Sequence, residues 1–181
     1  MKVYVDGACL RNGQPGASAG VGVFWGNGHP LNISEVVDGE KHTNQIAEIQ
    51  AATAAIGIAY QKGFDNLEIY TDSKYVFNGA TDWINNKWKV NGWRNARGGT
   101  VSNKEDWLNL DRIRMLYEDN FKKEINWFHV PAHQGNPGNE KADILARTAA
   151  QRQLHSFHQY REESNSDDNS SESDSNYGWH L

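Results

Sequence analysis

Residues 43–73, TNQIAEIQAATAAIGIAYQKGFDNLEIYTDS, contain a helix, a glycine stop and a strand in succession. The alanine- and isoleucine-rich part from Thr43 to about Gln61 favours a helix. Residues 67–71 then form a short, mostly apolar run that predicts a strand, and Ser73 opens a further helix. A helix followed by a strand predicts a right-handed crossover, which places the 67–71 strand parallel to an earlier strand.

The remaining sequence predicts the other strands of the same sheet. Three strands are expected before the crossover, and a last helix–strand–helix series after it. In quick succession, three strands favour an antiparallel meander. The predicted elements are strands 2–6, 18–25, 31–37 and 124–130, and helices from residue 104 to about 117 and from residue 140 to about 152. The fold class expected is α/β, with a five-stranded mixed sheet, three strands antiparallel and then two parallel, flanked by helices.

Four carboxylates lie where such side chains are locally out of place: Asp6, Glu48, Asp72 and Asp143. Asp6 and Asp72 each end an apolar run that predicts a strand, whereas Glu48 and Asp143 lie in predicted apolar helices. A single carboxylate at a strand end is more often a turn or helix-cap residue. Four carboxylates converging on one point would repel one another unless cations held them, and Mg²⁺ prefers such oxygen ligands. The sequence therefore predicts a metal site at the carboxyl ends of the parallel strands.

Composition indicates one enzyme-sized domain with a polar tail. The chain has 181 residues and a net charge of -5. Residues 1–150 carry 16 Lys and Arg against 17 Asp and Glu, whereas residues 151–181 carry 2 against 6. So polar a tail cannot form a core, so we expect a domain at residues 1–152 and a disordered acidic, serine-rich tail at residues 153–181. No long apolar run predicts a transmembrane helix, and no signal or transit peptide is expected.

The single cysteine, Cys9, excludes a disulfide within the chain. A reducing, intracellular compartment is therefore expected, with nucleus or cytoplasm favoured and the mitochondrion left open. No candidate base lies near Cys9 in the sequence, so a small packing or surface residue is the preferred interpretation over a nucleophile.

A basic segment from Lys87 to Lys104 contains five Lys or Arg residues and no acid. Trp83, Trp88 and Trp93 lie within or beside this segment. Basic side chains follow a phosphate backbone and aromatic rings stack on bases or pack on sugars, so the pattern is typical of a nucleic-acid surface. A solvated loop whose tryptophans fill the core is the alternative.

Five separated motifs lie in order between residues 2 and 150. The motifs are Asp6-Gly-Ala-Cys9, Thr43-Asn-Gln-Ile-Ala-Glu48, Tyr70-Thr-Asp-Ser73, His129-Val-Pro-Ala-His-Gln-Gly135 and Gly138-Asn-Glu-Lys-Ala-Asp143. Together, in this order, they resemble type I ribonuclease H in its eukaryotic-like form. The resemblance implies the ribonuclease H-like fold for the catalytic domain.

This resemblance also implies an activity and a cofactor. The expected enzyme is an endonuclease that hydrolyses the RNA strand of RNA–DNA hybrids and leaves 3′-hydroxyl and 5′-phosphate ends. Two Mg²⁺ ions, replaceable by Mn²⁺, would carry the reaction. The implied metal ligands and catalytic residues are Asp6, Glu48, Asp72 and Asp143. His133, in the loop before the last helix, is the implied proton shuttle or aid to product release, whereas His129 is expected to be structural.

Substrate-binding residues follow from the same resemblance. The RNA strand would be bound by Cys9, Asn12, Asn44 and Gln45, because side-chain amides can read a 2′-hydroxyl. The DNA strand would be bound by Lys41, Thr43, Trp83, Trp88, Trp93 and Asn103. Two departures from the family pattern are visible. Lys41 stands where arginine is common, which loses bidentate geometry, and one extra residue separates Trp83 from Trp88.

Two other functions remain open. A transposase- or integrase-like strand transferase would share the sheet and the metal chemistry. A non-catalytic hybrid-binding protein would be expected to have lost one of the four carboxylates. The partner expected is an RNA–DNA hybrid duplex bound by a monomer, with no protein partner and no membrane implied.

Overall fold

A computed structural model describes residues 1–132 and 135–169, with side chains described as far as residue 156. Its elements are β1 (Lys2–Leu10), β2 (Ser18–Phe24), β3 (Ile33–Val36), α1 (Asn44–Lys62), β4 (Glu68–Thr71), α2 (Lys74–Asn78), the π-helical segment η1 (Gly79–Trp88), α3 (Lys104–Phe121), β5 (Asn126–His129) and α4 (Pro137–Asn169). Within this described part, five strands form one sheet in the order β3-β2-β1-β4-β5. β1, β2 and β3 pair antiparallel, and β4 is parallel to both β1 and β5. The predicted mixed sheet is confirmed.

β1 is longer than the sequence predicts. The apolar run predicts an end at Asp6, but the strand continues to Leu10 because its ladder with β2 continues, with Asp6 opposite Gly22. Pairing of β1 with β4 stops at Tyr4. Asp6 therefore lies inside a strand, at the point where the parallel neighbour has ended.

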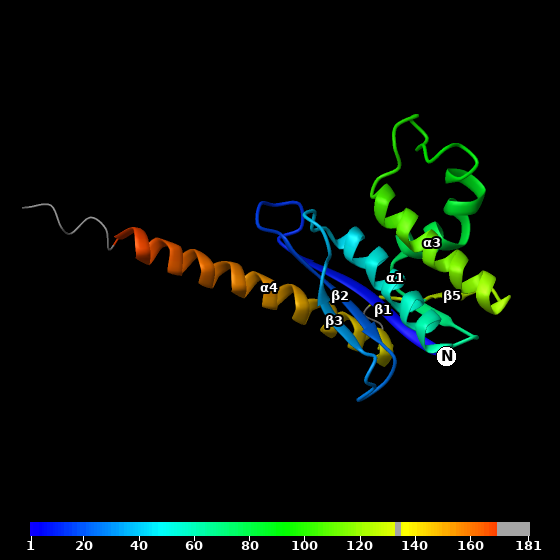
Figure 1. The fold of residues 1–181 in the computed structure, drawn as a ribbon, viewed down its shortest axis with the longest axis horizontal. Coiled ribbons are helices and arrows are strands. Elements are labelled where there is room, and N and C mark those ends of the chain that lie inside the picture. Colours follow the sequence, from blue (N-terminus) through cyan, green and yellow to red (C-terminus); the bar gives the residue numbers. More distant parts are fainter. Residues whose placement is uncertain (133–134, 170–181) are drawn as a thin grey trace, which may run out of the picture.

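Helices cover both faces of this sheet. α1 and α3 pack together on one face, where α1 also contacts β1, while α4 lies across β1, β2 and β3 on the other (Figure 1). α1 begins at the cap Thr43, whose hydroxyl oxygen accepts from the amide of Ile46, and ends at Gly63 in the left-handed conformation. Most of its isoleucines and alanines are buried, in the same core cluster as Val3 and Val5.

Two glycines allow the helices to approach the sheet at backbone distance. A Cβ atom on Gly7 would lie 2.2 Å from the backbone nitrogen of Glu48 in α1. On the opposite face, a Cβ atom on Gly22 would lie 2.1 Å from the carbonyl oxygen of Ala142 in α4. Only glycine fits at either position, so β1 and β2 fix the distance of each helix from the sheet.

α4 is longer than predicted. The sequence predicts an end near Arg152, but the helix runs for 33 residues to Asn169 and extends past the sheet (Figure 1). No glycine or proline follows Gly138 before the helix ends, so nothing in the sequence interrupts it. The division into a domain at residues 1–152 and a tail at residues 153–181 stays a prediction, with residues 170–181 outside the described part. None of the described helices combines the length and apolar character needed to cross a membrane.

η1 is an element that the sequence does not predict. Its ten residues form a π-helix, and the i to i+5 bonding continues beyond it, from the amide of Lys89 to Ile84 and from the amide of Trp93 to Trp88. A π-helix accommodates an inserted residue within a helical turn. Trp83 and Trp88, which the family pattern separates by one residue fewer, both lie in η1, and their ring centroids lie 5.6 Å apart.

Replacement of Gly22 by alanine should destabilise the protein. The new methyl group would press on the backbone of α4, and we expect the free energy of unfolding to fall by at least about 1–3 kcal/mol. Gly57 is the control, because it lies in α1 and a Cβ atom added there would have nothing within 4 Å. Gly57→Ala should instead raise stability by up to about 1 kcal/mol. Denaturant unfolding measures both, and a Gly22→Ala variant as stable as the parent would contradict the close-approach argument.

Candidate active site

Three of the four predicted carboxylates meet in the structure. Asp6, Glu48 and Asp72 each offer an oxygen, and these oxygens all lie within 4.8 Å of one another. Asp6 comes from β1 on the face covered by α4, Glu48 from α1 on the opposite face, and Asp72 from the end of β4. They can meet because the pairing of β1 with β4 ends before Asp6. Side chains from both faces of the sheet can therefore reach this point between the two strands. Three of the four predicted carboxylates therefore converge, at the point where the parallel pairing of β1 with β4 ends.

The electrostatics of this cluster are unfavourable without a cation. Asp6 and Glu48 are only 6% and 8% exposed. Burial, reinforced by Asp72 and Asp143, raises the pKa of Asp6 from its ordinary value of 3.8 to about 8. Burial and then the charges of Asp6 and Asp72 raise the pKa of Glu48 well above 4.5. Asp6 and Glu48 therefore resist ionisation at this crowded site.

Asp143 lies at the rim of the same cluster. Its Oδ1 accepts a hydrogen bond of 2.7 Å from Nε of Arg147, one helical turn further along α4. Asp143 and Arg147 line a pocket of about 390 Å³ together with the three central carboxylates. In this pair the side chain of Asp143 stays about one quarter exposed at the pocket.

The donor set fits a hard divalent cation. Oxygen ligands from several carboxylates are what Mg²⁺ and similar ions prefer. Oε2 of Glu48 is buried without a hydrogen-bond partner, which is costly unless another group satisfies it. A bound cation would satisfy that oxygen and would lower the pKa of the carboxylates that crowd around it. The residues present therefore fit a metal site.

Neighbouring polar side chains hold these carboxylates in place. Asn139 of α4, only 4% exposed, donates from Nδ2 to Oδ2 of Asp72 over 2.8 Å. Asn44 donates to Oε1 of Glu48 over 3.1 Å, and the amide of Gly7 donates to Asp6. The sequence did not single out Asn139 or Arg147. Both lie one turn from Asp143 on α4, and that spacing is the signal that could have found them.

The predicted RNA-strand residues lie beside the carboxylates. Cys9 and Asn44 line the carboxylate pocket, and Oδ1 of Asn12 accepts from the backbone amide of Asn44 over 3.3 Å. Oε1 of Gln45 accepts from Nδ2 of Asn103 over 3.2 Å. The four side chains therefore lie on adjoining parts of one surface. Burial raises the pKa of the Cys9 thiol, which agrees with a packing residue rather than a reactive thiolate.

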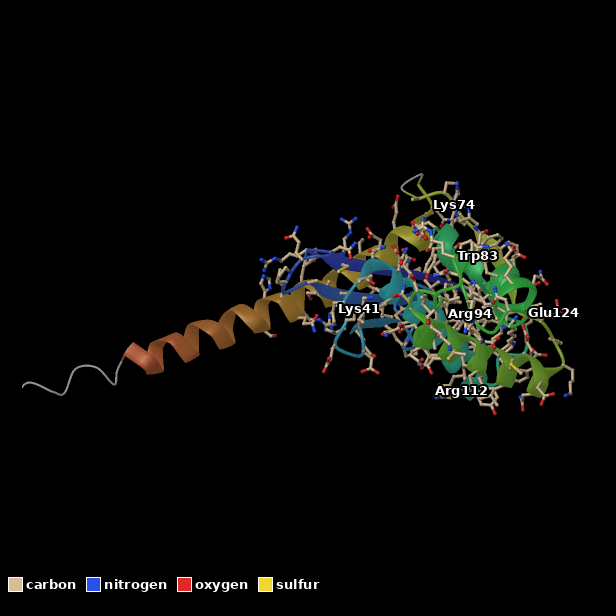
Figure 2. All side chains as sticks on the ribbon, turned by 90° about the horizontal axis from the view of Figure 1, so that it is seen from above. Lys41, Lys74, Trp83, Arg94, Arg112 and Glu124 are labelled. Atoms are coloured by element: carbon tan, nitrogen blue, oxygen red, sulfur yellow. The ribbon has the colours of Figure 1, made fainter. Side chains whose placement is uncertain are left out.

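The predicted DNA-strand residues fall into two groups. Thr43 caps α1 and keeps its hydroxyl proton free to donate, while the exposed Lys41 lies in the loop before that helix (Figure 2). Asn103 lies before α3, 3.4 Å from the hydroxyl of Tyr75. The same hydroxyl accepts from the indole nitrogen of Trp107 at 3.0 Å, which ties this group to the aromatic side chains that follow.

Those aromatic side chains form one continuous cluster. Trp88 contacts three other tryptophans, with ring centroids 5.6 Å from Trp83, 5.8 Å from Trp93 and 5.2 Å from Trp107. Trp107 is fully buried, whereas the other three are partly exposed. Trp83 and Trp88 line a hollow with Lys87 and Arg94, and Trp83 and Arg94 are labelled in Figure 2. Trp88 and Trp93 thus pack against the core while Trp83 and Trp88 line a surface hollow, and nucleic-acid binding by this surface stays a prediction.

The two histidines of the fourth motif differ in what the structure describes. His133 lies outside the described residues, so its predicted catalytic role stays a prediction. A ring nitrogen of His129 lies 3.2 Å from the backbone oxygen of Asp72, and the ring packs on Phe77. His129 therefore supports the backbone at the end of β4.

Comparisons with known proteins agree on one family. A family model described as RNase H matches residues 1–151. Ribonuclease H1 of Rattus norvegicus is 47% identical over 148 residues, which are 82% of this chain and 49% of that protein. Ribonuclease H of Cyanothece sp. is 38% identical over 149 residues, which are 82% of this chain and 88% of that protein. The chain thus spans about half the length of the mammalian relatives it matches and most of the length of the bacterial one.

Solved structures share the fold. LC9-RNase H1, a type 1 RNase H with the type 2 active-site motif, matches with a TM-score of 0.62 and 28% identity over 84% of this chain and 72% of that chain. The solution structure of the PFV RNase H domain matches with a TM-score of 0.61 and 25% identity, over 82% of this chain and 93% of that chain. Both cover most of the chain, as expected for a shared sheet and its helices.

The raised pKa of Asp6 predicts how stability depends on pH in EDTA. Because the folded pKa of about 8 exceeds the ordinary value of 3.8, this carboxyl stabilises the fold fully below pH 4. That contribution is lost as the pH rises to 8. The Asp6→Asn variant has no carboxyl here to ionise, so it does not suffer this loss. The difference in free energy of unfolding, variant minus parent, should therefore increase with pH, by a few kcal/mol at pH 8.

Asp119→Asn is the control for this experiment, because Asp119 is exposed at the end of α3. It should show no such trend between pH 5 and 9. Denaturant unfolding at several pH values gives the answer. A difference between Asp6→Asn and the parent that does not change with pH would exclude the raised pKa.

Proposed function

The chain belongs to the ribonuclease H family, and from this premise we propose that it is an endonuclease acting on RNA–DNA hybrids. It would hydrolyse the RNA strand and leave 3′-hydroxyl and 5′-phosphate ends. The observation that carries the proposal is the meeting of Asp6, Glu48 and Asp72, with Asp143 on the rim of the same pocket. A protein that only bound hybrids would have no use for so costly a cluster of buried carboxylates.

The proposed cofactor is a pair of Mg²⁺ ions, replaceable by Mn²⁺, held by Asp6, Glu48, Asp72 and Asp143. Bound there, the metal would make the attacking water more acidic and stabilise charge on the leaving 3′ oxygen. Asp6 and Glu48 must lose their protons for this, and their raised pKa values couple metal binding to proton release. Metal affinity should therefore rise with pH.

The chain's own residues prepare the pocket for the reacting phosphate. Asn139 fixes one oxygen of Asp72 and so leaves the other for a ligand. Asn44 fixes one oxygen of Glu48 in the same way. Arg147 neutralises part of the charge of Asp143 and places a guanidinium in the pocket, where a phosphate of the RNA strand would be attracted to it.

The proposed strand selectivity rests on the two groups of polar and aromatic residues around the pocket. Asn12, Asn44 and Gln45 would read 2′-hydroxyls of the RNA strand. Trp83 and Trp88 would pack on deoxyriboses, with Thr43 and Asn103 donating to a DNA phosphate. We further propose a monomer in the nucleus or cytoplasm, a setting supported by the single cysteine.

Asp72→Asn should abolish hydrolysis while hybrid binding remains. An amide keeps the shape of the side chain but is a poor ligand for a hard cation. We expect the rate on a hybrid to fall by at least about a thousandfold in Mg²⁺. Asp65→Asn is the control, because Asp65 is exposed and pairs with Lys123 outside the pocket. Cleavage by Asp72→Asn at a rate near that of the parent would rule out the assignment of this carboxylate.

A comparison of three duplexes of one sequence tests the substrate. We expect the initial rate at fixed Mg²⁺ and salt to be highest on the RNA–DNA hybrid. RNA–RNA should bind through its phosphates but be cut poorly, because extra 2′-hydroxyls crowd the tryptophan-lined surface. DNA–DNA should be cut least, because it offers no 2′-hydroxyl to Asn12, Asn44 and Gln45. Similar rates on hybrid and DNA–DNA would favour the strand-transferase alternative.

A further inference from the structure

A buried ion pair lies on the side of α3 that faces η1, away from the carboxylate pocket. Asp111 and Arg114 are each 6% exposed. Oδ1 of Asp111 accepts from Nη2 of Arg114 over 2.7 Å, and Oδ2 accepts from Nζ of Lys89 over 2.8 Å. The same Nη2 of Arg114 also donates to Oδ1 of Asn85 over 2.9 Å. One buried acid and one buried base on α3 therefore hold two residues of the preceding segment.

The two residues held in this way are neighbours of the tryptophans in the chain. Asn85 lies in η1, two residues after Trp83, and Lys89 directly follows Trp88. The amide of Lys89 also makes the i to i+5 bond to Ile84, so its backbone and side chain are both fixed. The ion-pair network thus connects α3 to the segment whose rings line the hollow with Lys87 and Arg94.

Because Asp111 and Arg114 are buried, this network holds η1 in one position relative to α3. A carboxylate as buried as that of Asp111 must keep its partners, because an unpaired buried charge is costly. Any displacement of η1 from α3 would separate Lys89 from Asp111 and Asn85 from Arg114. Exposed pairs of the same segment, such as Lys87 with Asp82, give no such restraint, since their side chains are about half exposed.

We propose that Asp111 and Arg114 are positioning residues, which set the place of the tryptophan-lined surface relative to the carboxylate pocket through Lys89 and Asn85. The inference rests on the proposed function, because that surface is taken to bind the DNA strand. It also gives Lys89 a role that differs from the other basic residues of its segment. Its ammonium group is used internally by Asp111 and is not a phosphate contact.

The sign of the effect of Asp111→Asn distinguishes positioning from simple electrostatics. Removing a negative charge beside a nucleic-acid surface should tighten binding if charge alone matters. If Asp111 positions the tryptophans, binding should weaken instead. We expect KM for the hybrid, and the Kd measured in EDTA where no cleavage occurs, to rise by about fivefold or more with kcat within about twofold of the parent.

Asp119→Asn is the matched control, because it removes an acid from the same helix where the side chain is 85% exposed. Its KM should stay at the parental value or fall slightly. Lys89→Gln adds a second comparison. It should weaken hybrid binding without changing the slope of log Kd against log salt, whereas loss of a phosphate contact would lower that slope by about 0.9.

Asn85→Ala keeps the test decisive if Asp111→Asn lowers stability too far. Asn85 is exposed and uncharged, so its removal leaves the buried pair in place and only releases η1. KM should rise in the same direction by about twofold, again with kcat retained. Hydrogen exchange provides a readout without substrate. The amides of Lys89 and Trp93 should lose protection in Asp111→Asn and Asn85→Ala, while those of α1 keep it.

The outcomes separate this inference from the proposed function. If the parent fails to cut a hybrid, the proposed function is wrong. Hydrogen exchange in the variants then remains as the test of whether the network holds η1. If the parent cuts, then an Asp111→Asn variant that binds the hybrid as tightly as the parent, or more tightly, overturns the inference. Unchanged KM in Asn85→Ala together with unchanged exchange at Lys89 and Trp93 overturns it as well.

Discussion

Direct contact between helix backbones and the sheet is the constraint on which the rest of the structure depends. Gly7 admits the backbone of α1 at Glu48, and Gly22 admits the backbone of α4 at Ala142, next to Asp143. These two contacts lie on opposite faces of adjacent strands, on either side of Asp6. A methyl group at either glycine would hold the helix farther from the sheet. The carboxylate that the helix carries would then stay too far from the others to meet them.

This packing brings together carboxylates that destabilise the fold when they are ionised. The carboxyls of Asp6 and Glu48 both have raised pKa values, which means that ionising them lowers stability. The core beneath them is built from closely packed alanine, valine and isoleucine, and it supplies the stability that the cluster removes. Such opposition is common where a site must be ready before its ligand arrives. A metal-binding protein with this arrangement should be markedly more stable when its cation is bound.

Sequence patterns predicted those features that depend on local signals. The crossover from α1 to β4 follows from helix formers, a stop and a strand, so Asp72 was placed correctly at a strand end. Asp6 was placed at a strand end as well, although β1 continues, because pairing with β2 is a long-range event that the sequence of β1 does not contain. The role of Asn139 and the π-helix of η1 were missed for the same reason. Each involves a partner from another element, since Asn139 donates to Asp72 and Asn85 of η1 accepts from Arg114 of α3.

The π-helical form of η1 has a consequence for how this part of the protein can change. A π-helix holds about one more residue in each turn than an α-helix does, and within η1 Trp83 still contacts Trp88. A change of one residue in this segment can therefore be taken up inside a helical turn rather than by a longer loop. For an engineer, η1 is a place where the length of the chain, and not only its sequence, can be varied.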